Sequence, residues 1–176
     1  MIKRFALFVI ILFSIYYGFS QEVQWEMDTV KKYEVPIGLC SWEELKGHEY
    51  YNEMSEQYAQ YQPNTKVMEE LSEQLSATSL HVDIYFGAWC GDSREHVPHF
   101  MKIHDDLLNN FGILVDYQFI GCNREKECGT TSDEIIEYVP TFIIYKIDNS
   151  GNHQIGKIIE TPEITLEEDL LKILHP

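Results

Sequence analysis

The sequence predicts an α/β fold in which a central mixed sheet of about four to five strands is flanked by helices. An apolar run at Val82–Phe86 is followed by a helical pattern that ends near Asn109, and then by a second apolar run at Ile113–Ile120. A strand–helix–strand unit of this size implies a right-handed crossover and parallel strands. Two further strand-like runs, Phe142–Ile147 and Gln154–Glu160, are joined by a polar turn and predict an antiparallel hairpin.

Capping residues and apolar spacing predict the flanking helices. Asn64 can cap a helix over Thr65–Leu75, in which apolar side chains recur every four residues on one face. Thr165 can cap a C-terminal helix with acidic residues in its first turn, where the helix dipole favours them. The polar, turn-rich segment 121–137 predicts a loop and a short helix with two candidate caps, Ser132 and Asp133.

Residues 1–20 have the pattern of an export signal. Lys3 and Arg4 precede an apolar run, Phe5–Tyr17, and Ser20 provides a small residue for cleavage. The run is shorter than the roughly 20 residues that span a bilayer, so an uncleaved anchor is the less favoured alternative. We expect export to the periplasm or the exterior, with no stable membrane insertion after cleavage.

Residues 21–64 are expected to form a mostly helical N-terminal extension. Ser41 is followed three residues later by Glu44, which fits a capping box at the start of a long helix. Pro36 and Gly38 indicate a turn before that helix.

The charge balance excludes some classes of partner. The chain has 29 acidic and 13 basic residues, for a formal net charge of −16. Nucleic-acid binding requires a basic face for the phosphates, and an anionic membrane surface also attracts basic segments. We therefore expect no nucleic-acid partner, and we attribute the charge to solubility.

The sequence has four cysteines, which could pair in the oxidising compartment that export implies. Cys122 and Cys128 are close enough in sequence for a structural disulfide that closes the loop between them. Alternatively, Cys122 follows a strand whose end lies on the same rim of the sheet as Cys90, where it could resolve a Cys90 adduct. Free thiols, or pairing with Cys40, are the other possibilities.

Cys90 is the candidate reactive residue. It follows the strand at Val82–Phe86 and stands at the start of the next helix. Free backbone N–H groups and the helix dipole at that position stabilise a thiolate, the nucleophilic form of cysteine. The alternative is a buried, inert cysteine.

The residues around Cys90 match a known motif. Trp89, Cys90 and Gly91 form the WCG that opens the WCGPC motif of thioredoxins, and Pro98 lies eight residues after the cysteine, where that family has a helix-kinking proline.

A second match lies before the hairpin. Val139, Pro140 and Thr141 resemble the hydrophobic–cis-Pro–Thr element that faces the thioredoxin active site. With the closing hairpin and helix, residues 65–176 resemble a complete thioredoxin fold. More narrowly, the chain resembles exported bacterial thioredoxin-like proteins with a WCGDS motif.

This resemblance implies roles for individual residues. Cys90 would be the nucleophile, Ser93 would assist it, and Pro140 would be cis and keep a backbone edge open for substrate peptides. Substrate contacts would come from the residues beside them, namely Trp89, Gly91, Asp92, Val139 and Thr141.

Two positions depart from the dithiol members of the family. Ser93 stands where the second cysteine would resolve a mixed disulfide, so the site is monothiol and needs an external or partner thiol. The Ser93 hydroxyl can instead donate a hydrogen bond to the Cys90 thiolate. Ile84 replaces the buried acid, and Asp83 should point to the opposite face of the strand, where we expect a solvated or edge position.

The sequence therefore predicts monothiol thiol–disulfide exchange of the isomerase or reductase type, by a monomer acting on protein or small-molecule thiols and disulfides without a cofactor. The alternative is a non-catalytic binding or chaperone-like module that captures partners at the same groove. A metal-handling role for Cys90 with His96 and His99 is a third hypothesis; three ligands on one helix close a tetrahedral site poorly, so we expect no metal.

Overall fold

The computed structural model describes residues 23–130 and 134–175, which form a mixed α/β structure. The sheet has six strands in the order β1-β2-β4-β3-β5-β6. The strands are β1 (Gln24–Met27), β2 (Glu34–Cys40), β3 (Ser79–Phe86), β4 (Asp116–Gly121), β5 (Thr141–Asp148) and β6 (Gly151–Ile159). The helices are α1 (Tyr51–Gln60), α2 (Thr65–Leu75), α3 (Gly91–Asp106), which continues into a π-helical turn, η1 (Leu107–Phe111), and α4 (Leu166–Leu174).

Strand pairing confirms the predicted central topology. Strand β3 runs parallel to β4, with Ile84 opposite Phe119, and antiparallel to β5, with Ile84 opposite Phe142. Strands β5 and β6 form the expected antiparallel hairpin. The sheet is therefore mixed, as predicted, although six strands exceed the expected four to five.

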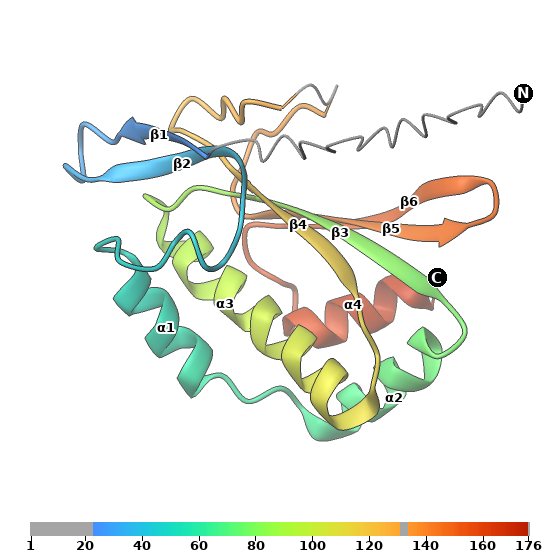
Figure 1. Ribbon diagram of the computed structural model, residues 1–176. Helices are drawn as coiled ribbons and strands as arrows, with labels where there is room; N and C mark the ends of the chain where they lie inside the picture. Colours follow the sequence, from blue (N-terminus) through green and yellow to red (C-terminus); the bar gives the residue numbers. More distant parts are fainter. Residues whose placement is uncertain (1–22, 131–133, 176) are drawn as a thin grey trace, which may run out of the picture.

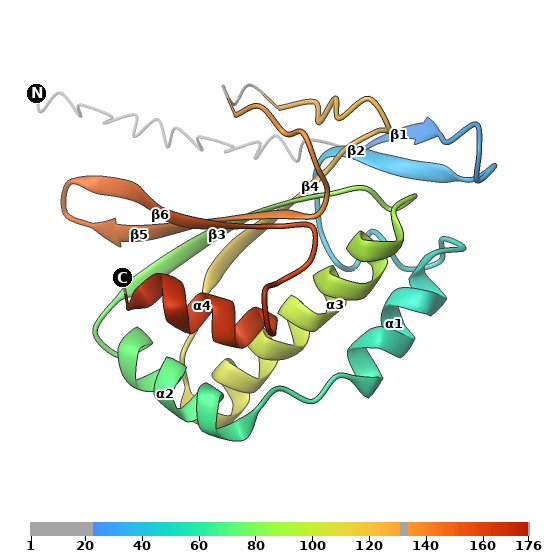
Figure 2. The same ribbon diagram turned by 180° about the vertical axis from the view of Figure 1, so that it is seen from behind.

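The four helices cover one face of the sheet, and Figures 1 and 2 show them below it in both views. Alternate residues of β3 divide the core accordingly. Ile84 and Phe86 belong to the large cluster between the sheet and the helices. Tyr85 belongs to a smaller cluster on the opposite face, which the segment between β4 and β5 covers.

The structure confirms the two helices, α2 and α4, that were predicted from capping residues and apolar spacing. Helix α2 has the predicted bounds, and the side chain of Asn64 accepts hydrogen bonds from the N–H groups of Lys66 and Val67. Thr165 caps α4 by accepting from the N–H of Glu168 at 3.4 Å. Both caps satisfy donors that the first turn of a helix leaves free.

The N-terminal segment is not mostly helical, contrary to expectation. Ser41 and Glu44 form the reciprocal hydrogen bonds of a capping box, but the residues after them form turns and α1 begins only at Tyr51. Gly47 lies between, with a φ of 91°, a left-handed conformation that interrupts a helix.

Strand β2 occupies the residues where a turn was predicted. Pro36 and Gly38 lie within this strand, which pairs antiparallel with both β1 and β4. A Cβ atom at Gly121 would lie 2.2 Å from the carbonyl oxygen of Pro36. The glycine therefore allows β2 to approach β4 closely and extend the sheet.

The segment between β4 and β5 also differs from the prediction. Ser132 and Asp133 lie outside the described residues, but 134–137 are not helical, so the short helix expected there is not found. The candidate signal at 1–20 likewise lies outside the described residues. Among the described helices, none has the length and apolar character needed to cross a membrane.

Candidate active site at the start of helix α3

Cys90 is the residue immediately before α3. Its N–H donates to the carbonyl of Gly87 at 2.8 Å, and its own carbonyl accepts from the N–H of Arg94 at 3.2 Å. The first-turn N–H groups that follow Cys90 have no partner within the helix. A Cβ atom at Gly87 would lie 2.6 Å from the Trp89 ring, so only glycine permits this turn without displacing the tryptophan.

The Cys90 thiol faces the segment that precedes β5. Its sulfur lies 3.3 Å from the carbonyl oxygen of Val139, to which it donates a hydrogen bond, and the residue is partly exposed. The Val139–Pro140 peptide bond is cis, as expected. The Thr141 hydroxyl donates a hydrogen bond to the carbonyl of Tyr138 at 2.8 Å, which links the two ends of the segment that contains the cis-proline.

Ser93, in the first turn of α3, is fully buried. Its hydroxyl oxygen accepts a hydrogen bond from the N–H of Gly87 at 3.2 Å. Within the described residues no hydrogen bond joins Ser93 to Cys90, so the expected contact with the sulfur is not formed here. The N–H of Gly87 occupies one lone pair of the Ser93 oxygen, so the Ser93 hydroxyl proton can still be donated to another acceptor.

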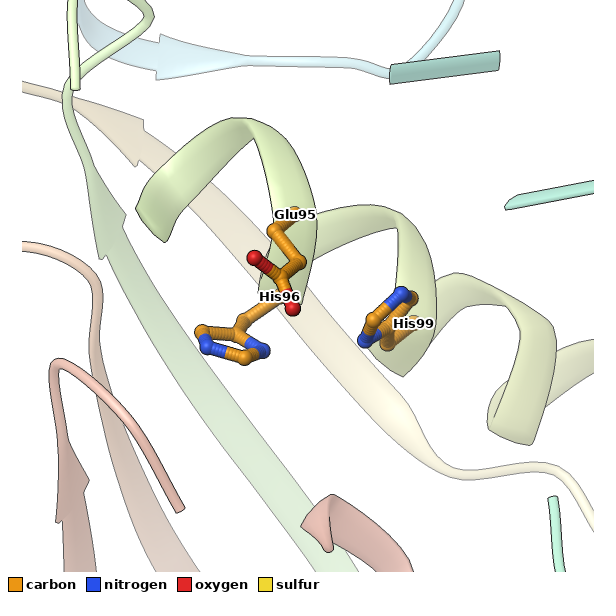
Figure 3. Close-up of side chains that lie close together, drawn as sticks. All are labelled: Glu95, His96 and His99. Atoms are coloured by element: carbon orange, nitrogen blue, oxygen red, sulfur yellow. The ribbon is translucent and has the colours of Figure 1, made fainter. Parts of the chain in front are cut away.

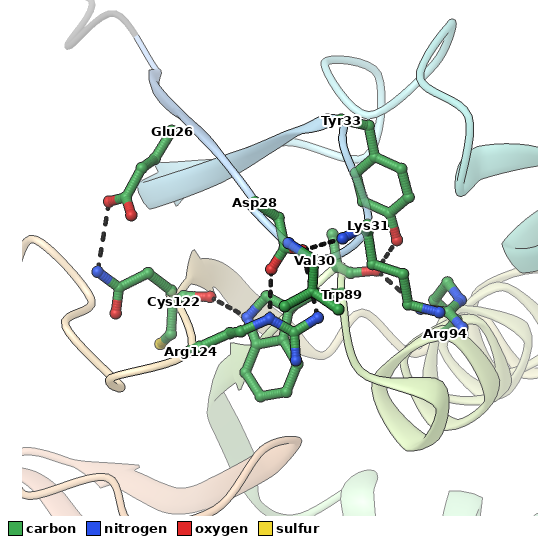
Figure 4. Close-up of polar contacts among 11 residues, drawn as sticks. Glu26, Asp28, Val30, Lys31, Tyr33, Trp89, Arg94, Cys122 and Arg124 are labelled. Carbon is green, nitrogen blue, oxygen red and sulfur yellow. Dashed lines mark hydrogen bonds and ion pairs between the residues drawn. The ribbon is translucent and has the colours of Figure 1, made fainter.

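Trp89 connects Cys90 to the disulfide loop. Cys122 and Cys128 form a disulfide, which decides between the alternatives that the sequence left open and leaves neither sulfur as a free resolving thiol. The indole N–H of Trp89 donates to the carbonyl of Cys122 at 2.9 Å (Figure 4). Arg124 and Lys126, inside the loop, lie over the indole ring at 4.7 and 5.8 Å from its centroid.

The β1–β2 connection holds that loop in place. Asp28 is buried and binds the Arg124 guanidinium through contacts of 2.6 and 3.2 Å (Figure 4). Burial opposes ionisation of Asp28, but the hydrogen bond from Arg124 and the N–H groups of Lys31 and Val30 outweigh it, so the pKa of this carboxyl lies below its usual value. The carboxylate is therefore charged, and it fixes the cation above Trp89.

A second cation lies under the Cys90 turn. Arg94 is buried, pairs with Glu53 of α1 at 2.6 Å and donates to the carbonyl of Ala88 at 3.1 Å. The same carbonyl accepts from the Tyr33 hydroxyl at 3.2 Å. These contacts tie the turn before Cys90 to α1 and to the N-terminal strands.

Arg94 and Arg124 were missed as site residues in the sequence. The helix dipole disfavours a cation near the start of a helix, so the position of Arg94 could have indicated that an acidic side chain pairs with it. Arg124 stands between two cysteines in a chain with few basic residues. Their acidic partners, Glu53 and Asp28, are distant in sequence and give no local pattern.

Cys40 is the other free cysteine. Burial of its thiol, with a contribution from the nearby Glu44 charge, raises the pKa of Cys40 to about 12. At neutral pH its thiolate is essentially absent. Any thiolate chemistry of the folded protein therefore falls to Cys90.

Asp83 is neither solvated nor at an edge, contrary to expectation. It lies on the face of β3 opposite Ile84, as predicted, but its side chain is only 13% exposed. The carboxylate contacts a ring nitrogen of His81 at 2.8 Å and accepts from the amide of Gln118 at 2.6 Å. β3 is a central strand, so its neighbours supply the polar partners that water would supply at an edge.

The structure thus brings Trp89 and Cys90 together with Val139, Pro140 and Thr141, and it leaves Gly91 and Asp92 exposed in the first turn of α3. No family model matches this chain, and no curated protein matches it. The function of this chain is therefore inferred from the geometry of the site.

Proposed function

We propose that this protein is an exported thioredoxin-like protein that carries out monothiol thiol–disulfide exchange through Cys90. The observation that carries this proposal is the position of one partly exposed thiol at the start of a helix, facing the Val139 carbonyl. That position combines access with proximity to the positive end of the α3 dipole, which in general favours a thiolate.

The order of elements supports the thioredoxin-like assignment. The parallel β3–α3–β4 unit, the β5–β6 hairpin and the terminal α4 follow the arrangement that the resemblance implies. One departure is the segment before β5, whose described part contains no helix. That segment instead supplies the Val139 carbonyl and the disulfide loop at the site.

The reaction requires two exchange steps. The Cys90 thiolate attacks one sulfur of a substrate disulfide, forms a mixed disulfide, and releases the other sulfur as a thiolate that takes a proton from solvent. A glutathione or protein thiolate then attacks the substrate sulfur of the mixed disulfide, forms a new disulfide with it, and releases Cys90 as a thiolate. The buried Ser93 hydroxyl makes no hydrogen bond to Cys90 in the resting structure, and its rotation toward the sulfur would let it donate to the thiolate that leaves in this second step.

The test is a glutathione-coupled assay on a small disulfide substrate. We expect turnover by the wild-type protein above the glutathione background, and loss of that turnover in Cys90→Ala. Cys40→Ala is the matched control, because its thiol is free but buried, and it should retain turnover. Equal rates for wild type and Cys90→Ala would contradict the proposal.

A hollow beside the site favours a second candidate, partner binding without turnover. Ile135, Tyr138 and Ile159 are 84%, 52% and 49% exposed, and they line a hollow of about 360 Å³ next to Thr141. Exposed apolar side chains beside Thr141, which directly follows the cis-proline, suit binding of an unfolded or extended segment. This candidate predicts a stable mixed disulfide with a cysteine-containing peptide but no turnover with glutathione.

A further inference from the structure

Helix α3 carries a group of metal-ligating side chains beyond Cys90. Glu95, His96 and His99 each offer one ligand atom, and these atoms all lie within 4.8 Å of one another (Figure 3). Glu95 and His99 are one helical turn apart, and His96 and His99 are three residues apart, so both spacings place neighbours on one surface of the helix. Cys90 is not part of this group.

His96 provides an independent indication of a ligand. The residue is only 7% exposed, and its Nδ1 is buried with no hydrogen-bond partner. Leaving a buried polar nitrogen unsatisfied costs about 1–3 kcal/mol. In Figure 3 the His96 ring turns one nitrogen toward the Glu95 carboxylate and the His99 ring. An ion held between these side chains would give that nitrogen a partner.

Packing holds His99 in position. Its ring stacks on Tyr61 with centroids 3.9 Å apart, and the Tyr61 hydroxyl donates a hydrogen bond to Glu167. One of the two imidazoles is therefore already fixed beside the other.

We propose that Glu95, His96 and His99 bind one divalent transition-metal ion, Zn²⁺ in particular, through two imidazole nitrogens and one carboxylate oxygen. Ligand atoms on one tetrahedral Zn²⁺ lie about 3.4 Å apart, because each bond is about 2.0–2.1 Å. The ligand atoms lie within 4.8 Å of one another, so they must close by up to about 1.4 Å, which requires rotation of the ligand side chains when the ion binds. The fourth position stays open to water or an exogenous ligand, as three-ligand zinc sites have.

This site differs from the one that the sequence suggested, because the reactive thiol is not a ligand. Its three ligands also lie on one helix, so we propose an open site completed by water and not a closed tetrahedral site. The Cys90 sulfur faces Val139, whereas the two histidines occupy the second and third turns of the helix. The proposal is therefore independent of disulfide exchange, and either can fail without the other.

The test measures Zn²⁺ binding to the purified protein by competition with a chromophoric chelator. We expect one equivalent bound by the wild type, and at least about tenfold weaker binding in Glu95→Gln and in His99→Gln, since even supporting residues of metal sites contribute 10–100-fold. His153→Gln, which alters an exposed histidine in the β5–β6 hairpin, and Cys90→Ala should bind as the wild type does.

Thermal stability and Co²⁺ spectra test the proposed ligands independently of the affinity measurement. Zn²⁺ should raise the thermal midpoint of the wild type but not of His99→Gln. Co²⁺ should give visible d–d bands without a thiolate charge-transfer band. Binding that persists at wild-type affinity in both ligand variants, binding lost in Cys90→Ala, or no binding to the wild type would each overturn the proposal.

Discussion

The Cys122–Cys128 disulfide gives the sharpest stability prediction. The bond spans a sequence separation of 6. For a closed loop of this size, the chain-entropy relation gives about 2 kcal/mol of stabilisation at room temperature, because the cross-link restricts the unfolded chain. We expect the double variant Cys122→Ala/Cys128→Ala to lose at least this amount in free energy of unfolding, measured by urea titration without reductant.

Reduction of the wild type provides the matched comparison. Dithiothreitol should lower the wild-type free energy of unfolding by about 2 kcal/mol, and it should leave the double variant unchanged. Because Trp89 donates to the Cys122 carbonyl and lies under Arg124, reduction should also alter tryptophan emission. A reductant effect below about 0.5 kcal/mol in the wild type would refute the entropic argument, and a reductant-sensitive double variant would show that another bond is responsible.

Three further predictions concern the site. Gly87→Ala should destabilise the fold by about 1–3 kcal/mol, because the added Cβ clashes with the Trp89 ring. Gly91→Ala should destabilise it much less, because a Cβ there meets nothing within 4 Å. Equal urea midpoints for the two variants would contradict this prediction. Ser93→Cys should form an internal disulfide on oxidation, leaving one titratable thiol in denaturant, and three would count against it. The pKa of Asp28 is lower in the folded protein than the value near 3.8 expected in the unfolded chain. The ionised carboxylate therefore stabilises the fold fully above pH 3.8, and this stabilisation is lost as the pH falls through the folded-state pKa. Asp28→Asn should therefore flatten the acid limb of stability against pH, and an unchanged acid limb would show that another group dominates.

Elements with local signals were predictable from the sequence. Helix α2 begins after an asparagine cap, and its apolar residues repeat with helical spacing, so its bounds follow from neighbouring residues alone. The β5–β6 hairpin has a turn sequence between two apolar runs. In these cases the local preference and the tertiary packing agree.

Elements stabilised by distant residues were not predictable. Strand β2 contains a proline and a glycine, which usually interrupt strands, and it is a strand because it pairs with β1 on one side and β4 on the other. Asp83 was expected in solvent because its partner Gln118 belongs to another strand. The reactive cysteine was predictable from its helix start, but the Asp28–Arg124 pair above Trp89 was not.

The central position of β3 has a consequence for the dynamics of the thiol. Strand β3 pairs with β4 on one side and β5 on the other, and its residues from Val82 to Phe86 are mostly buried. Amides in such a strand exchange with solvent deuterium only when the whole domain opens. Cys90 follows this strand by a short turn, so we expect its sulfur to be attached to one of the most protected parts of the described structure. Agents that unfold peripheral segments should therefore leave the thiol in place until the domain itself unfolds.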